Sequence, residues 1–216
     1  MYRPLPPADE DELRTRGRAL AGRTLGEIAG RLGACPPRDL RRDRGWVGRL
    51  LEAALGTDAG PRSRPDFSAL GIELKSLPVS RDGRTLESTF VCAVSRQRDT
   101  APVWEDSALR RKLARVLWVP VLAEPGLSPA QRRVGMPWLW SPTPGEAEVL
   151  RADWEELLQI LRLEGTEFLD GRYGNYLQLR PQGAPAGEDG VSWSFYLRPH
   201  FTARLLRIHY APAAAG

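Results

Sequence analysis

The sequence contains almost no lysine: of its 31 basic side chains, only Lys75 and Lys112 are lysines, and all the others are arginines. Arginine stays protonated, whereas an ammonium group is a compact charge whose pKa shifts readily, so a site that needs proton transfer or a small cation resists replacement by arginine. We therefore expect these two lysines to mark functional positions. Lys75 also follows two carboxylates, Asp66 and Glu73.

Cysteine, histidine and long apolar runs are scarce as well. Cys35 and Cys92 allow at most one disulfide bond, and they form no zinc-ligand pattern with His200 and His209. The longest apolar stretch, 116–123, is flanked by charge, is interrupted by a proline, and is far shorter than the roughly 20 residues that cross a bilayer. The first residues are charged and proline-rich, unlike a signal peptide. We therefore expect a soluble, cytoplasmic protein with no membrane partner.

Other familiar chemistries leave no trace in the sequence. There is no P-loop and no local signature of a Ser–His–Asp hydrolase, although a triad assembled from distant residues stays open. The net charge of +4 suits a partner made of phosphates, but this charge is weak support on its own. The length of 216 residues allows one large domain or two subdomains around a shared cleft.

Apolar periodicity predicts six helices. We expect them over residues 9–20, 24–31, 45–55, 107–115, 145–163 and 202–209. Thr24 and Glu27 form a capping box for the second helix. For the third helix, Asp43 is the candidate N-cap and Gly56 the stop. The seven tryptophans fall mostly within apolar stripes, which favours the core over a base-stacking platform.

Alternation of apolar and polar residues predicts strands. It places Ile72 and Leu74 on one side of a strand and Glu73 and Lys75 on the other. A turn signal follows at 81–83, and strand formers at 85–95 then favour a hairpin with this first strand. Further strands are predicted at 116–122, 176–180 and 194–198. Proline-rich loops surround 136–144, and 181–190 is a surface loop.

One short group of charged residues has the composition of a catalytic site. Asp66 is followed, after six residues, by Glu73, Leu74 and Lys75, and alternation brings Glu73 and Lys75 to the same face of a strand. Two carboxylates suit Mg²⁺, which takes the rest of its shell from water and phosphate. Lys75 would then position or deprotonate a water molecule that attacks a phosphate. The competing interpretation is an ordinary solvent-facing salt bridge.

Several segments resemble the MutH family of mismatch-repair endonucleases. The resemblance covers about residues 44–210 and is carried by RGWVGRLLE (44–52), DFSALGIELK (66–75), LESTFVC (86–92), RKLARVLW (111–118), QRRVG (131–135) and DWEE (153–156). It implies an α/β, restriction-endonuclease-like fold of the PD-(D/E)xK type, with a mixed sheet flanked by helices. The single MutH-type unit, 1–216, would divide into a catalytic subdomain, about 1–105, and a DNA-recognition subdomain, about 106–216, around a DNA-binding cleft.

The resemblance also implies an activity and partners. Members of the family use Mg²⁺ to nick the unmethylated strand of hemimethylated GATC sites in double-stranded DNA. They are activated by MutL at a mismatch marked by MutS, and we expect a monomer. Carried over by matching positions, Asp66 and Glu73 are metal ligands and Lys75 is the catalytic lysine. Glu52 is an additional acid and metal ligand, with a solvated helix face as its alternative interpretation, and Lys112 is a second cation near the scissile phosphate.

DNA-contacting positions follow in the same way. They are Arg44, Gly45, Phe90, Arg180, Pro181, Gln182, Gly183 and Tyr196. An arginine can reach O6 and N7 of guanine together, and the tyrosine would lie against the adenine N6 position, where methylation is read. Ordinary structural roles compete: an exposed strand end for Arg180, a half-buried strand residue for Tyr196 and a core residue for Phe90. The loop 181–191 is shorter than in relatives.

Two alternative functions remain open. One is a related restriction enzyme that cuts both strands of GATC, against which the single catalytic unit argues. The other is a DNA-binding or scaffold module without catalysis, against which the complete set of Asp66, Glu73 and Lys75 argues.

Overall fold

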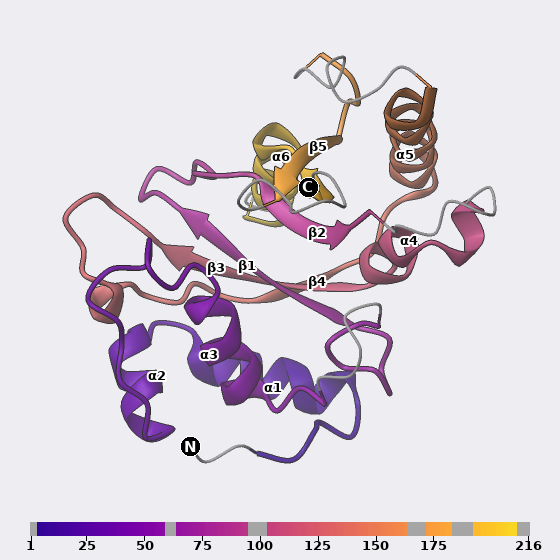
Figure 1. Ribbon diagram of the computed structural model, residues 1–216. Coiled ribbons are helices and arrows are strands. Elements are labelled where there is room, and N and C mark those ends of the chain that lie inside the picture. Colours follow the sequence, from indigo (N-terminus) through magenta and orange to yellow (C-terminus); the bar gives the residue numbers. More distant parts are fainter. Residues whose placement is uncertain (1–3, 59–63, 95–102, 164–171, 183–191, 211–216) are drawn as a thin grey trace, which may run out of the picture.

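The computed structural model describes residues 4–58, 64–94, 103–163, 172–182 and 192–210, and within them the chain is a mixed α/β protein with two small sheets. Three helices lie on one side of the first sheet, and the second sheet lies on the other (Figure 1). The helices are α1 (Glu10–Leu20), α2 (Leu25–Arg31), α3 (Trp46–Leu55), α4 (Ala108–Leu113), α5 (Pro144–Leu163) and α6 (Pro199–Tyr210). The strands are β1 (Glu73–Val79), β2 (Thr89–Ala93), β3 (Val116–Leu122), β4 (Trp138–Trp140), β5 (Leu177–Gln182) and β6 (Ser192–Leu197).

Local sequence signals set the ends of the first helices. The capping box of α2 is confirmed: the Glu27 backbone N–H donates to the Thr24 hydroxyl at 3.1 Å, and the Glu27 carboxylate accepts from the Thr24 N–H at 2.6 Å. Gly56 ends α3, as predicted, with a φ of 79° in the left-handed region that glycine adopts at little cost. These ends needed no tertiary information.

The predicted N-cap of α3 is wrong. Gly45 occupies that position and makes no side-chain capping hydrogen bond. The carboxylate of Asp43 instead accepts a hydrogen bond from the Arg49 guanidinium, one turn inside the helix. A charged partner is a stronger attraction for a carboxylate than a backbone N–H, so the ion pair takes the side chain away from the cap.

The first sheet has the order β1–β3–β4, with β1 parallel to β3 and β4 antiparallel to β3. Its register places Glu73 opposite Val116 and Lys75 opposite Trp118. Leu74 faces a hydrophobic cluster shared with α1, α2 and α3, whereas Leu77 faces a second cluster shared with the other sheet and α4–α6. The sheet is therefore covered on both faces, which explains the continuous apolar run of β3.

The predicted hairpin between β1 and β2 is wrong. The turn exists, with a single bridge between Val79 and Thr85, but β2 then pairs with β6 in the second sheet, whose order is β2–β6–β5. Pro78 accepts from the Leu86 N–H at 3.1 Å and has no N–H to return. A second strand along this edge of β1 would lack a hydrogen-bond donor at Pro78, so pairing with β1 ends after one bridge.

Other differences are smaller. The short strand β4 lies within a segment predicted as loop, and α6 begins at Pro199, three residues before its expected start; proline suits the first turn of a helix because its missing N–H is not needed there. The expectation for the tryptophans is confirmed, since all seven lie in or against the hydrophobic clusters. None of the described helices is long and apolar enough to cross a membrane.

The division of the chain near residue 105 into two subdomains stays a prediction. β3 and β4 follow that point yet share a sheet with β1, and β2 precedes it yet belongs to the sheet of β5 and β6. Each half of the chain therefore contributes a segment to the sheet of the other half.

Candidate active site and nucleic-acid interface

The carboxylate of Glu73 is the centre of a buried ionic cluster. Its Oε1 accepts from the Lys75 ammonium at 2.7 Å and from the Lys112 ammonium at 2.8 Å, and its Oε2 accepts from Lys112 at 3.0 Å. The exposed fractions are 2% for Glu73, 9% for Lys75 and 7% for Lys112. The alternative of a solvent-facing salt bridge is therefore wrong. The only two lysines of the chain meet at one carboxylate.

The topology of the first sheet creates this meeting. Glu73 begins β1, and its backbone N–H donates to the Arg115 carbonyl at 2.9 Å, at the junction between α4 and β3. Because β1 and β3 run parallel, the end of α4 lies beside the start of β1. Lys112 on α4 thus reaches Glu73 although 39 positions separate them in the sequence.

Asp66 turns back toward the same strand, as the sequence predicted. The residues after it form a tight turn, in which Phe67 and Ile72 exchange two backbone hydrogen bonds of 2.9 and 3.2 Å and Gly71 adopts a positive φ. The turn brings Oδ2 of Asp66 within 2.8 Å of the Leu74 N–H, from which it accepts. Asp66 therefore lies against the segment that carries Glu73 and Lys75.

The electrostatics of Asp66 reflect this crowding. Burial and, after it, the nearby charge of Glu73 raise its pKa to about 6, while the hydrogen bond from Leu74 and the charges of Lys75 and Lys112 oppose the shift. Two carboxylates that repel each other in a partly buried site are a donor set that fits a hard divalent cation, because the cation would relieve the repulsion. Asp66 and Glu73 are thus the residues that could hold a metal.

The third predicted ligand, Glu52, lies on α3 and is half-buried. Within the described ranges, no three His, Cys, Asp or Glu side chains are grouped closely enough to hold a metal ion. The role of Glu52 as a ligand therefore stays a prediction.

Cys92 is a neighbour of the cluster that no sequence signal indicated. It is buried on β2, and burial raises the pKa of its thiol to about 11, although the charges of Lys75 and Lys112 act in the opposite direction. A thiol with so high a pKa is a poor nucleophile at neutral pH. We therefore regard Cys92 as part of the apolar wall behind the lysines.

A second group of predicted residues forms a row on the other sheet. Phe90 on β2 lies directly opposite Tyr196 on β6, and their rings meet edge to face at 5.5 Å. The Arg180 guanidinium of β5 lies over the Tyr196 ring at 5.6 Å, and the Lys75 ammonium lies 5.7 Å from the Phe90 ring centroid. This row joins the buried ionic cluster to the residues predicted to read DNA.

Exposure decides between the two interpretations of Phe90, whereas those of Tyr196 and Arg180 are both compatible with it. Phe90 is 41% exposed, so the alternative that it is a core residue is wrong. Tyr196 is half-buried, and Arg180 and Pro181 are exposed on β5. Pro181 and Gln182 pair with β6 as the last residues of β5, so the prediction that a loop begins at 181 is wrong. Gly183 lies outside the described residues, as does the rest of the loop 181–191.

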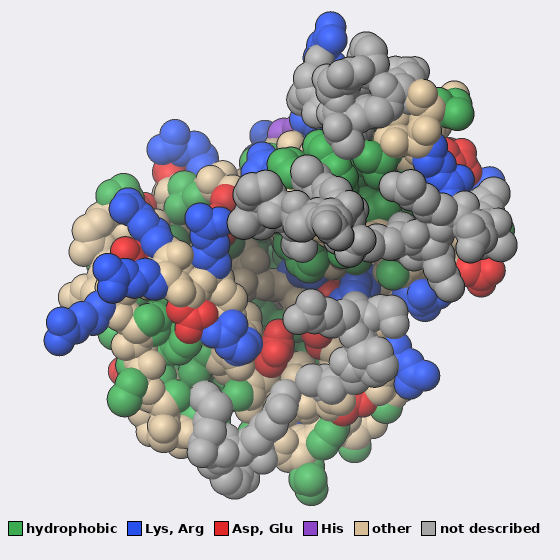
Figure 2. Space-filling view, viewed as in Figure 1, with side chains coloured by type: hydrophobic (Ala, Val, Ile, Leu, Met, Phe, Trp, Pro, Cys, Tyr) green, Lys and Arg blue, Asp and Glu red, His purple; other side chains and the backbone are tan. Residues whose placement is uncertain are grey.

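Arg44 and Gly45 are exposed where α3 begins. The space-filling view shows Lys and Arg side chains, with carboxylates among them, around the hollow between the part formed by α1–α3 and the part formed by the second sheet (Figure 2). Such a surface suits a phosphate backbone.

The start of β5 depends on a buried acid that the sequence pattern did not mark as functional. The carboxylate of Asp153, on α5, accepts from the backbone N–H groups of Asn175, Tyr176 and Leu177 at 2.7, 2.6 and 2.8 Å. This carboxylate therefore determines where the strand that carries Arg180 begins. Asn175 itself lies at a bend just before β5.

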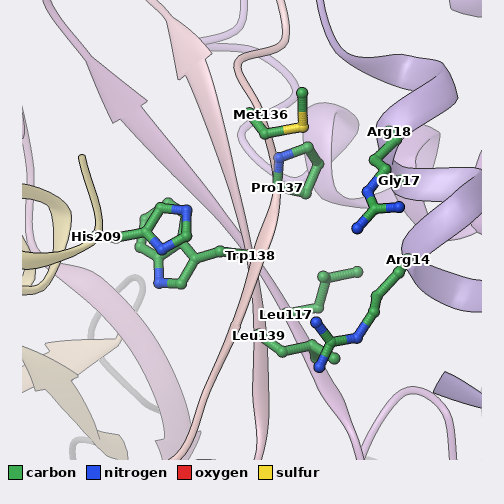
Figure 3. A pocket seen from close by; sticks show the side chains of 9 residues that line it. All are labelled: Arg14, Gly17, Arg18, Leu117, Met136, Pro137, Trp138, Leu139 and His209. Carbon is green, nitrogen blue, oxygen red and sulfur yellow. The ribbon is translucent and has the colours of Figure 1, made fainter. Parts of the chain in front are cut away.

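Among the described residues, two of the pockets lie outside the ionic cluster. One, of about 230 Å³, lies between α1, β4 and α6, where the His209 ring stacks on Trp138 at 4.8 Å and Arg14 and Arg18 form the opposite wall (Figure 3). The other, of about 560 Å³, is bordered by α4 and by Pro65 and Gly71, close to the turn that holds Asp66. The second pocket adjoins the candidate active site, whereas the first does not.

Comparison with known proteins agrees with the resemblance seen in the sequence. Residues 55–153 match the family model described as "DNA mismatch repair enzyme MutH". The chain is 47% identical to the DNA mismatch repair protein MutH of Yersinia enterocolitica, with 96% of each chain covered. It is 46% identical, at the same coverage, to the proteins of that name from Yersinia pseudotuberculosis and Yersinia pestis.

Proposed function

Because this chain belongs to the MutH family of DNA mismatch repair enzymes, we propose that it is a Mg²⁺-dependent endonuclease that nicks the unmethylated strand at hemimethylated GATC sites. One observation carries the proposal: the buried cluster in which Lys75 and Lys112 share the Glu73 carboxylate, with Asp66 beside it. A buried cluster of charges is expensive to maintain, and such clusters concentrate at functional sites.

Asp66 and Glu73 would hold the metal, and Glu52 would assist them. A bound Mg²⁺ supplies electrostatic stabilisation of the charge that develops on the phosphate and lowers the pKa of bound water. Lys75 lies 2.7 Å from the proposed metal ligand Glu73, so it would orient the attacking water as an ammonium group, or accept the proton of that water when its side chain is the neutral amine. Lys112 would neutralise charge near the scissile phosphate. The reaction would leave a 5′-phosphate.

DNA recognition would use the row on the second sheet. Arg180 is exposed and held over Tyr196, so its guanidinium is free to read the guanine edge, and Tyr196 would contact the adenine N6 position. Arg44 and Gly45 would contact the backbone at the start of α3. Phe90, exposed between Lys75 and Tyr196, would contact DNA next to the scissile position.

The fold and the partners form part of the same proposal. The mixed sheet with Asp66, Glu73 and Lys75 at one end fits a restriction-endonuclease-like unit, divided into catalytic and recognition subdomains. MutL would activate the protein at mismatches found by MutS, and the protein would act as a cytoplasmic monomer.

The decisive experiment uses purified protein, Mg²⁺ and a MutL-type partner with strand-labelled duplexes. The duplexes carry unmethylated, hemimethylated or fully methylated GATC, or a scrambled site. Nicking confined to the unmethylated strand at GATC supports the proposal. Double-strand cutting favours a restriction enzyme, and binding without cleavage under several metals favours a scaffold.

Variants connect that activity to the site. Asp66→Ala and Lys75→Ala should abolish nicking and leave DNA binding intact, and retained nicking would contradict the assigned roles. Tyr196→Ser should cut fully methylated sites with less discrimination than the wild type, because the contact at adenine N6 is lost. Unchanged discrimination would refute that role.

A further inference from the structure

The metal-binding end of the candidate site is already neutralised by the chain itself. Asp66 and Glu73 contribute two negative charges, and Lys75 and Lys112 contribute two positive ones. Three ammonium contacts, of 2.7 to 3.0 Å, occupy the oxygens of Glu73. A carboxylate offers only about four lone-pair positions, so little of Glu73 is left for another ligand.

The two lysines hold Glu73 in different ways. Lys75 is on the same strand and contacts Oε1 alone, whereas Lys112 comes from α4 and contacts both oxygens. Both oxygens are the atoms that a cation at this site would use. Lys112 is moreover attached to a different element, so its side chain can leave Glu73 without any change in the β1 backbone.

We propose that Lys112 competes with the divalent cation for Glu73 in the free protein, so that a DNA phosphate must attract Lys112 away before the cation binds tightly. This inference rests on the proposed function, because it assumes that Asp66 and Glu73 hold a cation. Charge drives the competition: an ammonium group and a cation on the same buried carboxylate repel each other at low dielectric. DNA supplies a replacement partner for Lys112, which makes metal binding conditional on substrate.

The first test measures binding of Mn²⁺ to the DNA-free protein from the electron paramagnetic resonance signal of free Mn²⁺. Lys112→Met keeps an unbranched apolar stem, in a side chain one atom shorter than that of lysine, and removes its charge. We expect this variant to bind one Mn²⁺ at least tenfold more tightly than the wild type. The gain should disappear in the Lys112→Met, Asp66→Asn double variant, which assigns the ion to this site.

Arg111→Met is the matched control. Arg111 is the neighbouring residue on α4 and is exposed, and its guanidinium donates to the Asp106 carbonyl and not to Glu73. The Arg111→Met variant also removes one positive charge from α4, but from an exposed side chain that does not contact Glu73. Its Mn²⁺ affinity should therefore stay within about twofold of that of the wild type. An equal gain in Arg111→Met would show a general charge effect and overturn the proposal.

A second test adds DNA. A GATC duplex should raise the Mn²⁺ affinity of the wild type, and a duplex with an uncharged methylphosphonate at the scissile position should raise it much less. Both increases should be smaller in Lys112→Met, since the competition is already absent there. By linkage, Mn²⁺ should tighten DNA binding of the wild type by the same factor.

Unchanged or weaker Mn²⁺ binding in Lys112→Met overturns the inference. Lys112→Gln, which also removes the charge, replaces the methionine variant in this test if that variant does not fold. The outcome is separable from the proposed function. If the wild type nicks DNA but Lys112→Met binds Mn²⁺ no more tightly than the wild type, only the competition is refuted. If the wild type nicks DNA in none of the assays but Lys112→Met binds Mn²⁺ clearly more tightly, the proposed activity is refuted and the competition is supported.

Discussion

Phe90 and Tyr196 face each other across β2 and β6, with ring centroids 5.5 Å apart and an interplanar angle of 74°. Immediately after this pair the register shifts, so that Cys92 and not Val91 lies opposite Phe195. The irregularity lets Val91 and Cys92 both be buried while Phe90 stays exposed. An aromatic ring is thereby kept at the surface between Lys75 and Tyr196.

Replacing Phe90 by leucine should slow nicking by roughly tenfold, because two aromatic contacts worth about 1 kcal/mol each are weakened. The ammonium group of Lys75 and the ring of Tyr196 would both lose a fixed neighbour. Single-turnover nicking of a hemimethylated GATC duplex measures the effect. Phe90→Tyr keeps the ring and should nick at nearly the wild-type rate. A leucine variant as fast as the wild type would show that neither contact matters to the reaction.

The raised pKa of Asp66 predicts a dependence of stability on pH. In the folded protein the pKa is about 6, above the ordinary 3.8, so folding favours the protonated form. The contribution of Asp66 to stability is therefore fully present below pH 3.8 and is lost as the pH rises through 6. The loss is at most about 3 kcal/mol, less what residual solvent exposure removes. Urea unfolding of wild type and Asp66→Asn in EDTA should show the variant gaining relative stability between about pH 4 and 7.5.

Asp58 provides a control of opposite sign. Burial alone would raise its pKa, but hydrogen bonds from Ser68, including one of 2.8 Å from the backbone N–H, outweigh burial and lower it. The contribution of Asp58 to stability is present above its ordinary pKa of 3.8 and is lost as the pH falls through its lowered pKa in the folded protein. Asp58→Asn should therefore lose relative stability on going from acid to neutral pH, and the same trend in both variants would contradict the assignment.

Asp153→Asn should destabilise the protein by about 2–4 kcal/mol, because an amide nitrogen would face backbone N–H groups that now donate to a buried carboxylate. Chemical denaturation gives the free energy of unfolding. Glu155→Gln, on the same helix, loses only an exposed pair with Arg151 and should change stability by less than about 0.5 kcal/mol. Similar small effects for both variants would mean that β5 does not depend on Asp153.

The pair between Glu10 and Arg115 connects α1 to the junction that binds the Glu73 N–H. Two contacts, of 3.0 and 2.7 Å, form it, and the hydrogen bond from Arg115 holds the pKa of Glu10 below its ordinary value. Arg115→Met should cost about 1 kcal/mol near neutral pH. The cost should shrink as the pH falls through the lowered pKa of Glu10, since the carboxylate then becomes protonated.

Arg14→Met is the comparison for that prediction. Arg14 meets the same carboxylate through a single contact of 3.5 Å, so its removal should cost less. Thermal unfolding of both variants at neutral and acidic pH separates the two pairs. A cost for Arg115→Met that does not change with pH would assign its effect to packing.

Sequence patterns predicted the structure correctly where one segment contains the whole cause. The capping box of Thr24 and Glu27, the stop at Gly56 and the alternation that puts Glu73 and Lys75 on one face depend on neighbours a few positions apart. Sequence patterns gave wrong predictions where a residue or strand farther along the sequence takes part in the interaction. Asp43 pairs with Arg49 and does not cap α3, and β2 pairs with β6 and does not form the expected hairpin with β1.

The candidate site shows the same division. The sequence by itself determined which side chains are present: two lysines in the whole chain, and the spacing of Asp66, Glu73 and Lys75 that a short turn and one strand convert into proximity. Only the tertiary structure decided that both lysines hold the same carboxylate, because the parallel pairing of β1 with β3 brings α4 to the start of β1. It also decided that Phe90 is exposed, because a register shift depends on the partner strand and leaves no mark in the local pattern.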